Sequence, residues 1–285
     1  MKTLITILAC FAAVPASAQT LEFISSHSLP SQLSDSSSNF HPQGLGIDEA
    51  NERLVYAQQS TSNIWSSDLD GSDVSVLSTA GAGHVTSVAM WAGELFYSDY
   101  GGNNSGPDLH RTTPPSTTST TYSTYTAAYG GMPIDIRQGR FYRSNLWSSS
   151  YTWANLNQVA VANVGSPNSV IRTMNLSGTS GIGDIAVDVD SNSLWVLEYT
   201  TSARVHRYDL DTGVLLATYS AIGDGRDAGL TYYGGRLYHY DWVAGSGSTL
   251  TVYATGLAGF QTCTDGMDPV DIDEDGDNDS CIHPT

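Results

Sequence analysis

The chain has 285 residues and a net charge of −18, and Lys2 is its only lysine. Binding to nucleic acid needs a basic surface that neutralises phosphates, so this composition argues against a nucleic-acid partner. After the N-terminus, no segment has the roughly 18 continuous apolar residues of a membrane helix, which argues against a transmembrane segment.

The N-terminus has the three parts of a secretory signal peptide. Lys2 supplies the positive charge, residues 4–14 are apolar, and residues 16–18 form a small-residue cleavage site. Cleavage after residue 18 predicts a secreted, extracellular protein, with the periplasm or the cell surface as other destinations. A lipoprotein signal that acylates Cys10 is an alternative, although it would leave an apolar segment of only a few residues.

Five copies of one pattern follow along the chain. Each copy has a strand of small residues, a tight turn, and a second strand that is rich in aromatic residues and ends in a carboxylate or carboxamide. The expected first strands are residues 44–48, 87–90, 133–136, 184–188 and 229–232, and the expected second strands are 54–58, 95–99, 141–145, 194–198 and 237–241. Third and fourth strands follow in most copies, for example in residues 63–71 and 74–77.

Four antiparallel strands in each repeat of about 40–50 residues are typical of a β-propeller blade. The predicted fold class is therefore all-β, with a propeller over residues 19–258; a β-sandwich is the alternative. The last copy lacks one strand, and residues 21–28 form a strand that belongs to no copy. We expect this N-terminal strand to complete the last blade and close the ring, which would hide two sheet edges.

Two of the second strands carry a family resemblance. Leu95-Phe96-Tyr97-Ser98-Asp99 and Leu237-Tyr238-His239-Tyr240-Asp241 resemble the YWTD repeat of low-density-lipoprotein-receptor propellers and, more distantly, NHL and gluconolactonase-type propellers. YWTD propellers normally have six blades, so the resemblance leaves room for a degenerate sixth blade in residues 112–128 or 148–157. It also implies that the polar residue ending each second strand hydrogen-bonds the backbone of the next blade. These residues are Gln58, Asp99, Asn145, Glu198 and Asp241.

Propellers bind ligands where the loops before the inner strands converge, and here those loops carry polar side chains. The candidate ligand-binding residues are His41, Gln43, His84, Asp184, Arg226 and Asp227. We expect them to bind an extracellular protein or glycan, and we assign no catalytic residue. The gluconolactonase-type resemblance implies an alternative, a metal-dependent lactonase-type hydrolase that would use His41, His84, Asp184 and Asp227. Against it, Gln43 stands where the resemblance would place an acidic metal ligand.

The C-terminal tail, residues 259–285, is strongly acidic. Oxygen ligands recur at alternate positions around a Gly turn, at Asp271, Asp273, Asp275, Asp277 and Asp279. Calcium binds six to eight such oxygens, so the spacing predicts a calcium site, and Cys263 and Cys281 are expected to form a disulfide around it. The segment resembles a thrombospondin type 3 repeat; a disordered acidic tail is the alternative. Self-association through this tail, in an extracellular matrix or filament, is a third possible function.

Overall fold

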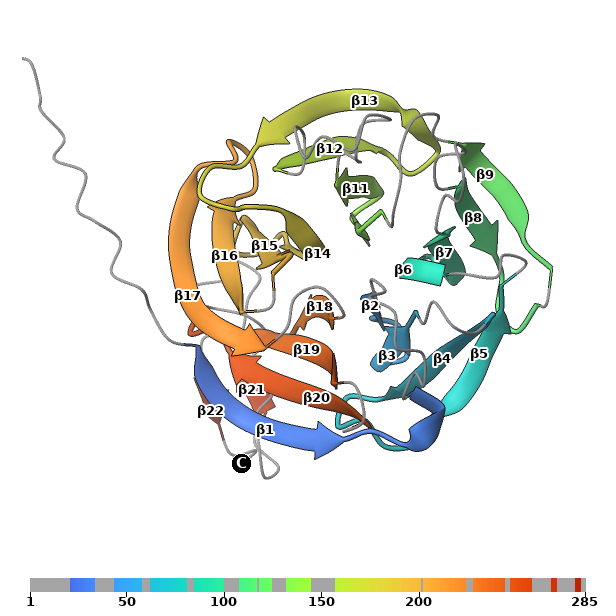
Figure 1. Ribbon diagram of the computed structural model, residues 1–285, viewed down its shortest axis with the longest axis horizontal. Coiled ribbons are helices and arrows are strands. Elements are labelled where there is room, and N and C mark those ends of the chain that lie inside the picture. The colour runs from blue at the N-terminus through green and yellow to red at the C-terminus, as the bar shows by residue number, and fades with distance from the viewer. Residues whose placement is uncertain are drawn as a thin grey trace, which may run out of the picture.

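The computed structural model describes residues 21–33, 44–57, 62–80, 85–99, 108–116, 118–124, 132–144, 157–200, 202–223, 228–243, 247–257, 268–270 and 280–282. Five four-stranded antiparallel sheets stand around one axis (Figure 1). The protein is therefore a β-propeller of five blades, as the repeats predict. Its described residues contain no α-helix, and none of them forms a helix that is long and apolar enough to span a membrane.

Each blade starts at the axis and runs outward. Blade 1 contains β2 (Leu45–Asp48), β3 (Arg53–Tyr56), β4 (Asn63–Asp68) and β5 (Ser75–Thr79). Blade 2 contains β6 (Val85–Trp91), β7 (Glu94–Asp99), β8 (Asp108–Thr112) and β9 (Thr120–Thr124). Blade 3 contains β10 (Ile134–Arg137), β11 (Arg140–Ser144), β12 (Gln158–Asn163) and β13 (Ser166–Asn175).

The remaining blades complete the circle. Blade 4 contains β14 (Ile182–Asp188), β15 (Ser193–Glu198), β16 (Ala203–Asp209) and β17 (Leu215–Gly223). Blade 5 contains β18 (Ala228–Tyr233), β19 (Arg236–Val243), β20 (Gly247–Ala254) and, as its outer strand, β1 (Glu22–Ser28). A 3-10 turn, η1 (Ser31–Leu33), follows β1, and a separate two-stranded sheet pairs β21 (Asp268–Val270) with β22 (Ser280–Ile282).

The N-terminal strand closes the ring, which confirms the prediction from the sequence. Strand β1 pairs antiparallel with β20, from Glu22 opposite Ala254 to Ser28 opposite Thr249 (Figure 1). The first and last described strands of the propeller thus share one sheet, so neither blade 5 nor the ring is complete without both ends of the domain.

The number of blades is settled by the outer half of blade 2. Residues 112–128, one of the two places proposed for a sixth blade, include β9, which pairs with β8 as the outer strand of blade 2. The other place, residues 148–157, lies almost wholly outside the described residues.

The core is divided among the interfaces between blades. Each of the five apolar clusters joins two neighbouring blades, because a single sheet cannot cover both of its apolar faces. At the closure, Tyr56 of blade 1 packs edge-to-face on Tyr240 of blade 5, with ring centroids 5.3 Å apart. Aromatic second strands therefore pack between blades, as predicted.

Small residues let the inner strands approach closely near the axis. A methyl group on Gly229 of β18 would lie 2.5 Å from the backbone nitrogen of Leu45 in β2. This distance is shorter than any that a Cβ atom normally makes to another heavy atom in proteins. Only glycine fits between the inner strands of blades 5 and 1 at this point.

Two of the polar residues that end the second strands accept hydrogen bonds from nearby backbone amides. Asp99 accepts one from the Asp108 amide (2.6 Å), and Glu198 accepts one from the Ser180 amide (3.1 Å). Asp108 begins the third strand of the same blade, directly opposite Asp99, and Ser180 lies in the connection that precedes β14. The described residues show no bond from these two carboxylates to the next blade, and the segments that lead into the next blades, residues 125–131 and 224–227, lie outside them. Gln58 and Asn145 lie outside the described residues.

Candidate functional site: an axial cavity

Asp184 lies toward the end of the ring axis at which the inner strands begin, and it holds three of these strands together. It is 1% exposed, and burial raises the pKa of its carboxyl group. Its Oδ2 accepts hydrogen bonds from the amides of Leu230 (2.8 Å) and Leu45 (3.2 Å), and its Oδ1 accepts one from Ile185 (3.0 Å). One carboxylate thus joins blades 1, 4 and 5.

A buried ion pair lies on the axis toward the end at which the inner strands finish. Arg137, at the end of β10, has a side chain that is 5% exposed and lies 3.1 Å from Asp135 Oδ1. Burial raises the pKa of Asp135, and Arg137 and the amides of Val187 and Ile136 counteract that rise. The two side chains share one face because they are two residues apart on a strand.

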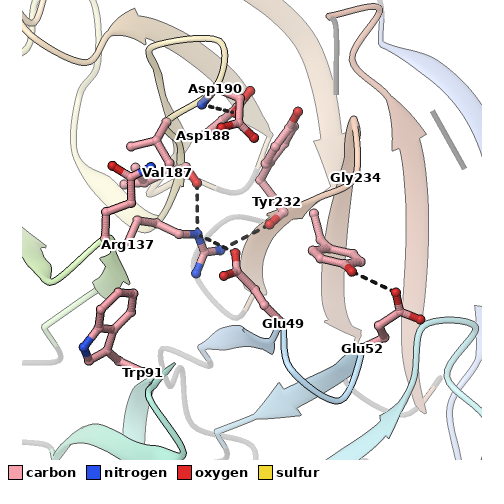
Figure 2. A pocket seen from close by; sticks show the side chains of 12 residues that line it. Glu49, Glu52, Trp91, Arg137, Val187, Asp188, Asp190, Tyr232 and Gly234 are labelled. Atoms are coloured by element: carbon pink, nitrogen blue, oxygen red, sulfur yellow. Dashed lines mark hydrogen bonds and ion pairs between the residues drawn. The ribbon is translucent and has the colours of Figure 1, made fainter. Parts of the chain in front are cut away.

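The Arg137 guanidinium also joins three other blades. Its Nε donates to the Val187 carbonyl of blade 4, and its Nη2 donates to the Tyr232 carbonyl of blade 5, both at 3.2 Å. Its Nε also lies 3.4 Å from Glu49 Oε1 of blade 1 (Figure 2). The side chain therefore closes the axis beneath a hollow in the surface.

That hollow is a cavity of about 440 Å³ at the ends of the five inner strands. We call it the axial cavity, and we call this side of the ring the cavity face. Every blade contributes to the wall, either through the end of its first strand or through the turn that follows this strand. The wall includes Glu49 and Glu52 of blade 1, Trp91 of blade 2, Arg137 of blade 3, Asp188 and Asp190 of blade 4, and Tyr232 and Tyr233 of blade 5.

Carboxylates outnumber cations in this wall. Asp188 accepts hydrogen bonds from the amides of Asp190 and Ser191, both at 3.2 Å, and from the Ser191 hydroxyl. Burial and the nearby Asp188 raise the pKa of Asp190. The wall thus contains four acidic side chains and a single guanidinium, which Asp135 already neutralises, so the acidic groups give the cavity a negative potential.

Aromatic rings supply the rest of the wall. The Tyr233 hydroxyl donates to Glu52 Oε1 (3.0 Å), and burial together with Glu52 raises the pKa of Tyr233 to about 12. Tyr232 stacks on Trp195 with 12° between the ring planes, and burial and Asp188 raise its pKa. Trp91 and Tyr232 lie on opposite sides of Arg137 (Figure 2). The cavity thus combines hydrogen-bond acceptors with apolar ring surface.

Only one of the ligand-binding candidates from the sequence falls within the described residues. Asp184 is buried at the opposite end of the axis from the axial cavity, where its oxygens accept backbone hydrogen bonds. The others lie outside the described residues: His41, Gln43, His84, Arg226 and Asp227. Among the six, the described Asp184 is therefore not part of the axial cavity.

The axial cavity was missed by the sequence analysis, although the sequence carries one indication of it. Asp135 and Arg137 alternate with isoleucines in an otherwise apolar inner strand. Two opposite charges on one face of a buried strand predict a buried ion pair, since such charges must be paired. The other residues of the wall belong to ordinary hairpin turns and give no such signal.

The tail is described only at two short strands. Asp271, Asp273, Asp275, Asp277, Asp279 and Cys263 lie outside the described residues, and of Cys281 only the backbone is described. Strands β21 and β22 pair Val270 with Ser280, so the two ends of the acidic segment lie side by side. The signal peptide also lies outside the described residues.

The fold and the cavity define the class: a five-bladed β-propeller with an acidic, aromatic-lined cavity on its axis. No model of a known protein family matches the chain, and no curated protein matches its sequence. Similar solved structures include the nidogen/laminin complex, at 14% identity over 70% of this chain and 71% of that chain, with a TM-score of 0.47. A gluconolactonase from Xanthomonas campestris is 15% identical over 74% of this chain and 71% of that chain, with a TM-score of 0.49. These similarities concern the fold.

Proposed function

We propose that this protein is a secreted binding module that takes part of an extracellular protein or glycan into the axial cavity. The observation that carries the proposal is the wall itself, in which four carboxylates and three aromatic rings surround one neutralised arginine. Binding sites are concave and largely apolar, with a few polar groups that fix orientation. The axial cavity has this composition.

The charge of the wall defines the chemistry of the ligand. Carboxylates only accept hydrogen bonds, so the ligand has to supply donors. A lysine or arginine side chain of a protein partner supplies donors and a positive charge, and it stacks favourably on an aromatic ring. A sugar supplies hydroxyl donors and an apolar face. The net charge of −18 also attracts a basic partner over longer distances, which favours the protein ligand.

The proposal is tested with arginine-containing and lysine-containing tripeptides and with an array of glycans. We expect saturable binding of at least one of these probes, and we expect Trp91→Ala to weaken it by about 30-fold, since a desolvated cation–π contact contributes about 2 kcal/mol. Isothermal titration calorimetry at low and high salt measures the affinity. Basic peptides should lose affinity with added salt, whereas a neutral glycan should not.

The matched control is Glu22→Gln, which removes one exposed carboxylate from the outer strand β1, far from the cavity wall. Asp190→Asn removes one from the wall. If the two variants bind the probe equally well, or if Trp91→Ala binds as the wild type does, the axial cavity is not the binding site.

We further propose that the tail binds calcium. Support comes from the alternating acids and from the pairing of β21 with β22, which brings the ends of the acidic segment together. Replacement of Asp271, Asp273 and Asp275 by asparagine in the full chain should remove at least one bound calcium ion, as counted by native mass spectrometry. An unchanged calcium count would contradict this proposal, and probe binding at the axial cavity would be unaffected.

A further inference from the structure

Two blades carry a histidine at the same place in their sheets. His110 of β8 and His206 of β16 each lie opposite the fourth residue of the second strand. In both blades the second strand ends two residues later in a carboxylate, Asp99 or Glu198. The two blades can therefore be compared position by position.

In blade 4 an arginine neutralises the carboxylate. Arg204 precedes His206 by two residues, so both side chains project from the same face of β16. Its Nε lies 2.9 Å from Glu198 Oε2, and its Nη2 lies 3.2 Å from Glu198 Oε1. The Nε2 atom of His206 lies 3.8 Å from the same carboxylate. One negative charge thus faces one positive charge.

In blade 2 the position of Arg204 is taken by a second carboxylate, Asp108. Ligand atoms of Asp99, Asp108 and His110 all lie within 4.8 Å of one another, and His110 Nε2 is 3.2 Å from Asp99 Oδ2. Asp108 Oδ1 is fully buried and makes no hydrogen bond with the described part of the chain. Arg111 projects from the other face of β8 and pairs with Glu94 (2.8 Å). Among the described residues, two clustered carboxylates therefore stand where blade 4 has an ion pair.

A buried carboxylate oxygen without a partner costs free energy unless a cation or a donor meets it. In the other three blades the position of Asp108 holds a neutral side chain, namely Asn63, Gln158 or Thr249. Blade 2 is thus the one described blade with two carboxylates and a histidine at this place. One imidazole nitrogen and two carboxylates form a ligand set that suits zinc and related divalent transition metals.

We propose that Asp99, Asp108 and His110 bind one divalent transition-metal ion, with zinc as the best fit. The ion takes the place that the Arg204 guanidinium has in blade 4, and its two positive charges balance the two carboxylates. It fastens the end of β7 to the start of β8. Because Asp99 ends the strand that leads away from the first hairpin of the blade, the site lies on the face opposite the axial cavity, and it is independent of ligand binding there.

The test uses the full chain, stripped with EDTA and then titrated with Zn²⁺ alone. Asp108→Arg gives blade 2 the ion pair of blade 4, and Asp108→Asn removes the charge with almost no change in shape. We expect each variant to bind one zinc ion fewer than the wild type by native mass spectrometry. The affinity at this site should fall by more than about 100-fold, since loss of even an outer-shell partner costs about 10- to 100-fold.

Two further measurements test whether the metal ion is bound by these three residues. Co²⁺ bound at the site should give a visible absorption spectrum that changes on His110→Gln, and Asp211→Asn, an exposed acid of blade 4, should leave the zinc count unchanged. Circular dichroism confirms that each variant is folded, and if Asp108→Arg fails to fold, Asp108→Asn decides. The proposal is overturned if the wild type binds no zinc, or if folded Asp108 variants bind as many zinc ions as the wild type with equal affinity.

Discussion

Arg137→Met is expected to lower the free energy of unfolding by about 3–5 kcal/mol, the usual cost of removing one partner from a buried ion pair. The substitution leaves the Asp135 carboxylate buried without its cation, and it leaves the carbonyls of Val187 and Tyr232 without their donor. Since this guanidinium contacts blades 3, 4, 5 and 1, its loss weakens the ring at the point where the blades meet. Urea unfolding followed by tryptophan fluorescence measures the change.

Arg140→Met is the matched control, because Arg140 is an exposed arginine in the same hairpin. It should cost less than about 1 kcal/mol. The double variant Arg137→Met with Asp135→Asn should be more stable than the sum of the single effects predicts, since the second change removes the uncompensated charge. Equal losses for Arg137→Met and Arg140→Met would show that the axial ion pair does not stabilise the ring.

A second expected result is a loss of stability on mild acidification, caused by His239 of β19. This side chain is 0% exposed, neither ring nitrogen has a hydrogen bond within the described structure, and burial lowers its pKa from 6.5 to about 4. Above pH 6.5 the imidazole is neutral in both the folded and the unfolded chain. As the pH falls below 6.5, the unfolded chain binds a proton that the folded chain does not bind until about pH 4.

The free energy of unfolding should therefore decrease by about 1.4 kcal/mol for each pH unit between 6.5 and 4, or about 3 kcal/mol in all. His239→Leu removes the titrating group at similar volume, so this component of the pH dependence should disappear. Urea unfolding of both proteins at several pH values measures the difference, in which the contributions of distant acids that both proteins share cancel. Parallel curves for the two proteins would contradict the assignment.

Much of the fold could be predicted because each blade repeats a local pattern. Short aromatic strands after tight turns recur along the chain, and the glycine at position 229 indicates close packing that the structure shows against Leu45. The N-terminal strand could be assigned because one blade lacked a strand and one strand lacked a blade. Both features follow from residues that are close in sequence or from the number of strands in each repeat.

The axial cavity could not be predicted in the same way. Its wall takes one turn from each blade, and which turns face one another depends on the number of blades, which the sequence left open. The contact between Asp99 and His110 depends on the register of β7 against β8, across a connection whose length does not fix that register. The candidates predicted from the sequence belong to the loops before the inner strands, whereas the residues of the cavity wall stand at the other ends of these strands.

The pairing of β1 with β20 has a consequence for how the chain folds. Residues 22–28 are synthesised long before their partners, residues 249–254, which are among the last of the propeller to be made. Until then, the exposed edge of β1 has no native partner, and the sheet of blade 5 is incomplete. Contacts between such distant residues slow folding, so the finished ring should form only after synthesis of the whole domain.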